Sequence, residues 1–209
     1  CLEALAAARE QRQWAVYGRI LLPLQEARRQ RRMIAAEGVI RLGTADLTFD
    51  LDHWLTGLAG RGCLAVTRPH GAEEARAVLD EARRRDLHIE VLHMDSESGD
   101  RVWRVESLTC PGLSTQTAGP WQGWRDRWLE PGKIEPIRED ASKCERLPAD
   151  WFLDASERLG DEAIAQVSPD SPPVRQIEQL EARLTAAPDH EKLHQRLADA
   201  AVRAARNTV

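Results

Sequence analysis

The chain has 209 residues, 42% of them hydrophobic and 30% charged, which is typical of globular proteins and not of disordered chains. Its net charge of −5 disfavours a protein that coats nucleic acid, and no apolar run approaches the about 20 residues of a membrane-spanning helix. Only three of the 29 basic residues are lysines, which we interpret as the sign of a GC-rich bacterial genome and not as a binding signal.

The four cysteines (Cys1, Cys63, Cys110 and Cys144) show no CxxC spacing, so the sequence predicts neither a cysteine zinc site nor a disulfide scaffold. A cytoplasmic location is the simplest expectation. Because the sequence starts at a cysteine, an alternative is a mature bacterial lipoprotein, anchored in the cell envelope through acylated Cys1. A helical pattern begins at once, without a polar tether, which favours a fragment or processing boundary over the lipoprotein.

Residues 2–36 place their apolar side chains close to one helix face, which predicts a long helix. Pro23 should kink or split it, and Gly38 stands at a plausible C-cap position. Its second half carries an arginine set that could bind nucleic-acid phosphates (Arg28, Arg29, Arg31 and Arg32). We favour a solvated helix end whose cations suit the helix dipole, because Glu26 and Glu37 flank the set and no aromatic residues interrupt it.

Residues 39–108 contain the clearest pattern in the chain. Short strands are expected at 39–42 and 47–49, followed by a helix over 54–58 that Asp50 or Asp52 caps and Gly60 stops. A buried strand at 63–67, a helix at 72–85 and a strand at 89–94 should form a crossover with parallel strands. A polar turn at 95–100 then leads to an antiparallel strand at 102–108. His70 and Gly71 precede the crossover helix, at a position that can bind anions.

A tryptophan-rich segment follows a predicted loop at 110–120. Residues 120–130 predict a short helix bounded by prolines, and residues 134–137 a last edge strand. Three tryptophans would share one face of that helix, which is most often a core face. Two neighbouring arginines keep open a second interpretation, in which the group binds a partner (Trp121, Trp124, Trp128, Arg125 and Arg127).

The last part of the chain is helical. A helix is expected over 150–165, a Pro-rich linker at 168–173, and a helical hairpin over 174–206 that turns at Pro188 and Asp189. The stretch LEARLTAAPDHEKLHQRLADA resembles a single tetratricopeptide-type helix pair. That resemblance implies that the pair buries its apolar face against a neighbour. An ordinary αα-hairpin and a coiled-coil tail that pairs with a partner are the other interpretations.

Residues 190–194 read HEKLH and match the HExxH motif of zinc hydrolases, in which His190 and His194 would bind zinc and Glu191 would be the general base. Three features oppose this. The motif starts at a helix tip, no HxxGxxH extension follows, and the fifteen residues after His194 offer only Asp199 as a third ligand. We therefore interpret the motif as part of a solvated amphipathic helix and expect no cofactor.

The order strand, helix, strand, strand, followed by a helix and a last strand, is similar to that of SPOR domains. The similarity is carried by residues 64–66, 72–82, 89–91 and 103–105, in a region of about a third of the chain. It implies a cell-envelope module that binds septal glycan.

Together these patterns predict an α/β or α+β fold: a small mixed sheet with a strand–helix–strand–hairpin centre, a long N-terminal helix and a C-terminal helical hairpin. The segments are 1–37, 38–140, 141–167, 168–173 and 174–209. No complete catalytic set is present while several amphipathic surfaces are, so we expect a non-catalytic protein–protein interaction or scaffold domain within a larger assembly. The partner would be a protein, or a second copy bound through the helices. The alternatives are a nucleic-acid-binding accessory protein, a zinc hydrolase and a SPOR-like module.

Overall fold

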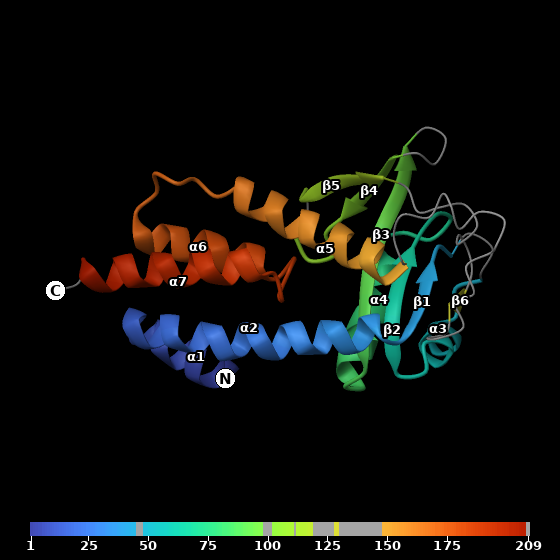
Figure 1. Cartoon of the computed structure of the whole chain (residues 1–209), viewed down its shortest axis with the longest axis horizontal. Helices are drawn as coiled ribbons and strands as arrows, with labels where there is room; N and C mark the ends of the chain where they lie inside the picture. The colour runs from blue at the N-terminus through green and yellow to red at the C-terminus, as the bar shows by residue number, and fades with distance from the viewer. Residues whose placement is uncertain (45–47, 98–101, 111, 119–127, 130–147, 208–209) are drawn as a thin grey trace. The chain divides into compact units, whose positions relative to one another are not determined.

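The computed structural model describes residues 1–44, 48–97, 102–110, 112–118, 128–129 and 148–207 (Figure 1). The chain divides into two compact units, each with its own core. Cys1–Gln30 and Leu159–Val209 form the helical unit, and Arg31–Arg158 form the α/β unit. The divisions at 30/31 and 158/159 fall inside two helices, whereas the sequence placed its segment boundaries at 37/38 and 140/141.

The helical unit contains α1 (Leu2–Glu10), most of α2 (Trp14–Ala36), the end of α5 (Pro148–Ala165), α6 (Pro173–Leu184) and α7 (Glu191–Arg206). The last two helices confirm the predicted hairpin, since their apolar residues at three- and four-residue spacing are buried. The core includes side chains from α2, α6 and α7 (Tyr17, Leu21, Leu24, Ile177, Leu180, Leu193, Leu197 and Ala201). Within the described residues, no helix combines the length and the hydropathy that crossing a lipid bilayer requires.

The break in the N-terminal helix lies at residues 11–13 and not at Pro23. There Arg12 adopts a φ of 53°, and the Gln13 N–H donates to the carbonyl of Ala8 at 2.8 Å. The buried residues Ala8 and Trp14 are six positions apart, so an unbroken helix would turn them toward different faces. Pro23 is exposed inside α2, which runs without a break to Ala36, so the prediction that it splits the helix in two is wrong, and the alternative of a kink stays a prediction.

The α/β unit is built on a six-stranded sheet in the order β5-β4-β3-β2-β1-β6. The strands are β1 (Val39–Leu42), β2 (Arg61–Val66), β3 (His88–Glu97), β4 (Val102–Glu106), β5 (Ser114–Ala118) and β6 (Trp128–Leu129). β1, β2 and β3 are parallel, and β4, β5 and β6 pair antiparallel with their neighbours (Figure 1). The predicted mixed sheet with a parallel crossover and an antiparallel hairpin is confirmed.

Helices cover both faces of this sheet. Leu64 and Val66 of β2, with Ile89 and Val91 of β3, pack on α3 (Leu51–Gly57) and α4 (Ala72–Arg84). The alternate residues pack on the other face with the end of α2 and the first half of α5 (Cys63, Ala65, Leu92, Met94, Ala35, Trp151, Phe152 and Ala155). The side-chain alternation of the strands therefore decides which helix each residue meets.

Two glycines permit the close pairing of β1 with β2. A Cβ on Gly62 would lie 2.2 Å from the carbonyl oxygen of Val39, and a Cβ on Gly38 would lie 2.2 Å from that of Arg61. Gly38 was expected to cap the preceding helix, but the short distance to the Arg61 carbonyl is the stronger reason for a glycine at this position. At α3 the predicted cap is confirmed, because the Asp50 carboxylate accepts the N–H of His53 at 3.0 Å.

Four sequence predictions in the α/β unit differ from the structure. The predicted loop at 110–120 contains β5, whose residues Ser114–Ala118 pair with β4. The tryptophan-bearing helix is wrong at its end, where Trp128 and Leu129 form β6 and pair with β1. Residues 48 and 49 are not in a strand, and β3 continues to Glu97, so the first three residues of the expected polar turn at 95–100 are in the strand. The predicted strand at 134–137 lies outside the described residues.

Candidate functional site

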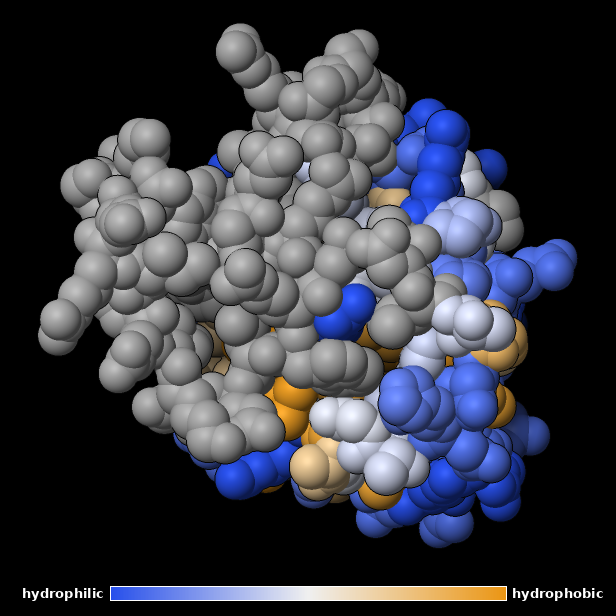
Figure 2. Space-filling model, turned by 90° about the vertical axis from the view of Figure 1, so that its right-hand side faces the viewer, coloured by the Kyte–Doolittle hydropathy of each residue, from blue (hydrophilic) through white to orange (hydrophobic). Residues whose placement is uncertain are grey.

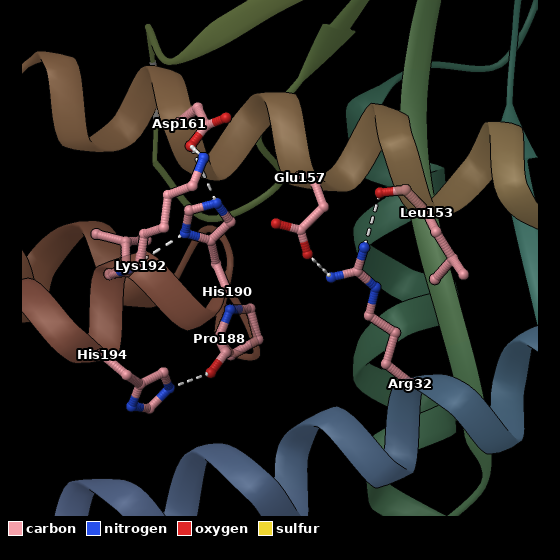
Figure 3. A network of polar contacts seen from close by, with 9 residues as sticks. Arg32, Leu153, Glu157, Asp161, Pro188, His190, Lys192 and His194 are labelled. Atoms are coloured by element: carbon pink, nitrogen blue, oxygen red, sulfur yellow. Dashed lines mark hydrogen bonds and ion pairs between the residues drawn. The ribbon is translucent and has the colours of Figure 1, made fainter.

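The HExxH segment lies where α7 begins, and its first histidine is not inside the helix. His190 is the N-cap residue of α7, and its Nδ1 accepts the N–H of Leu193 at 3.2 Å. The Nε2 of His194 donates to the carbonyl oxygen of Pro188 at 2.7 Å (Figure 3). Both imidazoles are enclosed, with exposed fractions of 0% for His190 and 3% for His194. The interpretation of the motif as a solvated helix is therefore wrong.

α5 completes the surroundings of His190 within the helical unit. The His190 Nε2 lies 3.4 Å from Oδ1 of Asp161, and the same oxygen accepts a hydrogen bond from Lys192 Nζ at 2.7 Å (Figure 3). The imidazole packs against Gly160, where a Cβ would stand 2.3 Å from the ring. His190 thus fastens the start of α7 to α5.

These contacts leave few ligand atoms for a metal ion. One nitrogen of each histidine is engaged with the backbone, and the two engaged nitrogens do not face a common point (Figure 3). Glu191 accepts a hydrogen bond from Gln195. In the part of the chain that the structure describes, no group of three or more histidine, cysteine, aspartate or glutamate side chains is arranged to hold a metal ion. The zinc hydrolase stays a prediction without geometric support.

Two residues of the predicted arginine set belong to the helical unit. Arg28 donates to the carbonyl oxygen of Pro188 at 3.1 Å, the acceptor that His194 also uses. Arg29 forms an ion pair with Glu26 one turn earlier on α2, at 2.8 Å. Arg28 therefore anchors the α6–α7 turn, and the charge of Arg29 is compensated on the helix surface.

The other two arginines belong to the α/β unit. Arg31 donates to the carbonyl oxygen of Leu87 at 2.8 Å. Arg32 is buried and donates to Glu157 at 2.8 Å and to the carbonyl oxygen of Leu153 at 2.7 Å (Figure 3). All four predicted arginines thus have acceptors within the protein, and their use for nucleic acid stays a prediction.

The predicted partner-binding group of tryptophans and arginines falls mostly outside the described residues, which include neither Trp121, Trp124, Arg125 nor Arg127. Trp128 is in β6, with Arg41 of β1 as its register partner. The structure therefore does not test whether these five residues form one binding group.

Sequence reasoning missed a cluster of buried polar residues at the carboxyl ends of β1, β2 and β3. Thr44 and Thr67 follow β1 and β2, and each backbone N–H donates to the other hydroxyl oxygen, at 2.8 and 2.9 Å. Arg41 is 4% exposed and donates to the carbonyl oxygen of Gly43. His93, 9% exposed, lies 3.1 Å from Glu106 of β4. The signal in the sequence was a polar residue near the end of each predicted strand: Thr44 two residues after 39–42, and Thr67 and His93 within the last two residues of 63–67 and 89–94.

This edge is where α/β sheets often bind ligands, usually at a point where the strand order reverses. Here β1, β2 and β3 follow one another in one direction, so the parallel strands have no such point. The predicted anion position before α4 is also occupied, since the Glu74 carboxylate accepts the N–H of Gly71 at 3.0 Å. Backbone hydrogen bonds at Glu74 itself and at Gly71 lower the pKa of this carboxyl.

Three aromatic rings join α3 to the start of α4. Trp54, fully buried, meets Phe49 and His70 edge-on, with ring centroids 5.2 and 5.1 Å apart. Such edge-to-face pairs stabilise packing beyond their buried area. His70 is therefore a packing residue at the beginning of α4.

Exposed apolar side chains occur on four helices of the helical unit. Leu22 of α2 is the most exposed, at 72%, and the others are Leu2, Val174 and Val202. Arg19 lies one turn before Leu22 on the same helix, is exposed, and forms no ion pair with any described residue. On the face shown in Figure 2, hydrophobic residues among the coloured atoms occur only in small groups between polar ones.

Comparison with protein-family models, with curated proteins and with solved structures finds no match to this chain. The order of its elements also departs from the SPOR-like order at one point, because β5 follows β4 where that order has a helix.

Proposed function

We propose that this chain is a non-catalytic protein–protein interaction module that binds an acidic protein partner through the face of α2 around Leu22. The observation that carries the proposal is the pairing of two features on that face. Leu22 exposes 72% of its surface, and the neighbouring Arg19 has a cation that no described residue neutralises. Residues three apart on a helix lie side by side, so the two side chains form one surface.

An apolar side chain beside a free cation suits a partner that offers an apolar site with a carboxylate next to it. Burying the leucine supplies most of the affinity, and the charge pair orients the partner and selects against basic surfaces. Single exposed apolar residues are common on soluble proteins, and the combination with Arg19 distinguishes this face from them. A second copy of the chain fits this surface less well, because the Arg19 cations of the two copies would lie close together and repel each other.

The non-catalytic part of the proposal is supported by how the strongest catalytic candidates are used. His190 and His194 hold backbone groups at the start of α7, and His93 pairs with Glu106. These are roles in holding the fold together. No specific observation favours the nucleic-acid-binding or glycan-binding alternatives over the interaction module.

A photo-crosslinking residue at position 22 of the full chain, in the cells that produce it, tests the proposal. We expect one discrete crosslinked protein with an acidic surface, lost when Arg19→Glu is added and retained when Arg196→Glu is added. Arg196 is a matched control because it is exposed on α7. Crosslinking only to a second copy of the chain, no crosslink at all, or a crosslink indifferent to Arg19 would each contradict the proposal.

A further inference from the structure

The two histidines of the α6–α7 turn are both enclosed within the helical unit, although sequence reasoning placed them in solvent. The Nε2 of His194 carries its proton, since it donates to the carbonyl oxygen of Pro188 at 2.7 Å. The remaining ring nitrogen, Nδ1, is buried and has no hydrogen-bond partner among the described residues. A neutral imidazole tolerates this arrangement, because only an acceptor is left unused.

A second proton on His194 would change this balance. It would place a donor without an acceptor, and a positive charge, inside the unit. The group facing it from α2 is the guanidinium of Arg28, which binds the same Pro188 carbonyl at 3.1 Å. The hydrogen bond to the Pro188 carbonyl and the Asp189 carboxylate favour the proton, whereas His190 disfavours it. Burial is the largest cause, and the pKa of His194 lies below its usual value.

His190 belongs to the same turn and holds the start of α7. Its Nδ1 accepts the N–H of Leu193 and caps the helix. The Asp161 carboxylate lies 3.4 Å from its other nitrogen and also binds Lys192. Local opening of the turn would therefore release the cap of α7 as well.

We propose that the α6–α7 turn is an acid-sensitive latch: a proton on His194 Nδ1 places an unpaired donor and a charge inside the unit beside Arg28, and the hairpin opens locally, which separates the Pro188 carbonyl from its two donors. The direction follows from proton linkage. An unfolded histidine titrates near pH 6.5, whereas the folded site resists the proton, so below about pH 6.5 the opened state binds more protons. Stability of the hairpin is then present above that pH and is lost as the pH falls toward the folded value.

Hydrogen exchange of the full chain between pH 7.5 and 5.0, corrected for intrinsic exchange rates, tests the latch. For one extra proton, the opening constant of the segment 186–197 should rise up to about tenfold for each pH unit below about 6.5. His194→Gln keeps a donor for the Pro188 carbonyl but cannot gain a charge, and should remove most of this rise. His53→Gln, a change at an exposed histidine of α3, should leave it intact.

A titration of the His194 ring signal by nuclear magnetic resonance in the unmodified chain keeps the proposal testable if His194→Gln fails to fold. The signal should stay that of the neutral ring until the hairpin loses protection. An ordinary titration near pH 6.5 with the hairpin still protected would overturn the proposal. An equal pH dependence of exchange in the unmodified chain and in His194→Gln would overturn it as well.

Discussion

The imidazole of His190 lies against the backbone of Gly160, and a Cβ at Gly160 would stand 2.3 Å from Cδ2 of the ring. No real side chain tolerates such a distance, so α5 can approach the start of α7 only because position 160 is a glycine. The ring is fully buried and cannot move aside without exposing its cap on α7. This close approach links a helix of the middle of the chain to the C-terminal hairpin.

Gly160→Ala should therefore destabilise the helical unit. The methyl group would gain about 1 kcal/mol of helix propensity but would displace a packed ring, at a cost of about 1–3 kcal/mol or more. Gly18→Ala is the matched control, because a Cβ there would meet its nearest atom at 3.7 Å and should be neutral or stabilising. Chemical denaturation followed by circular dichroism measures both; equal stabilities of the two variants would contradict the packing argument.

Gly160 also shows which features a sequence pattern can predict and which it cannot. The helix around it was predicted at 150–165 and is confirmed as Pro148–Ala165, because its apolar period is local information. The partner of Gly160 is thirty residues away along the chain, and no periodicity reveals it. The break at Arg12 is different: the six-residue interval from Ala8 to Trp14 was visible in the sequence and outweighs the proline signal.

The same distinction holds for the sheet. β2, with its continuous apolar run, and β3, with apolar residues in its first half, were predicted, whereas β5 was missed because its sequence STQTA is polar and lies on the sheet edge. Its pairing with β4 overrides a weak intrinsic preference. The burial of His190 and His194 was missed for a related reason, since their acceptors and donors belong to the backbone of the turn.

The reciprocal threonine pair at the ends of β1 and β2 should be sensitive to loss of a hydroxyl. The Thr44 hydroxyl accepts the N–H of Thr67 at 2.9 Å and donates to its carbonyl at 3.0 Å, with Thr44 fully buried. Thr44→Val has nearly the same shape but leaves a buried N–H without an acceptor, which costs about 1–3 kcal/mol. Thr44→Ser keeps the hydroxyl and should lose less. Urea denaturation compares them, and equal loss in both variants would refute the role of the hydroxyl.

Arg32 and Arg29 should differ in their contributions to stability, although both form ion pairs. Arg32 is buried in the α/β unit and satisfies a backbone carbonyl, so Arg32→Ala should cost about 1–3 kcal/mol by removing its hydrogen bonds to Leu153 and Glu157 and the packing of a buried side chain. The Arg29–Glu26 pair is exposed, and Arg29→Ala should cost well below 1 kcal/mol. Thermal unfolding checks the difference. If Arg29→Ala proves the more damaging change, the assignment of Arg32 as the structural member is wrong.

Zinc is expected to bind the HExxH segment no better than it binds a variant without the motif. The His190 Nδ1 accepts a backbone N–H, so a metal ion on that nitrogen would have to displace the cap of α7. The His194 Nε2 faces the Pro188 carbonyl, and its other nitrogen, Nδ1, is enclosed in the protein. After equilibration with excess zinc and dialysis, metal analysis should therefore give the same content for the unmodified chain and for His190→Gln. One zinc per chain that is absent from both His190→Gln and His194→Gln would instead restore the hydrolase hypothesis.

Tyr17 offers a test of the core of the helical unit, because it is the single tyrosine of the chain. Its hydroxyl is buried and donates to Glu181 at 2.7 Å, while Arg9 binds the same carboxylate. Burial, and then the hydrogen bond to Glu181, raise the pKa of the Tyr17 phenol above its usual value. An unfolded tyrosine loses its proton near pH 10, so above that pH the unfolded state binds fewer protons and the stability of the unit falls.

The tyrosinate absorbance near 295 nm reports Tyr17 alone, and it should appear only together with the loss of helical circular dichroism. Tyr17→Phe should lose about 1–3 kcal/mol at neutral pH and show a weaker decline in alkali. A tyrosinate signal with a midpoint near pH 10 in a chain that is still folded would show that the hydroxyl is accessible and the contact with Glu181 absent.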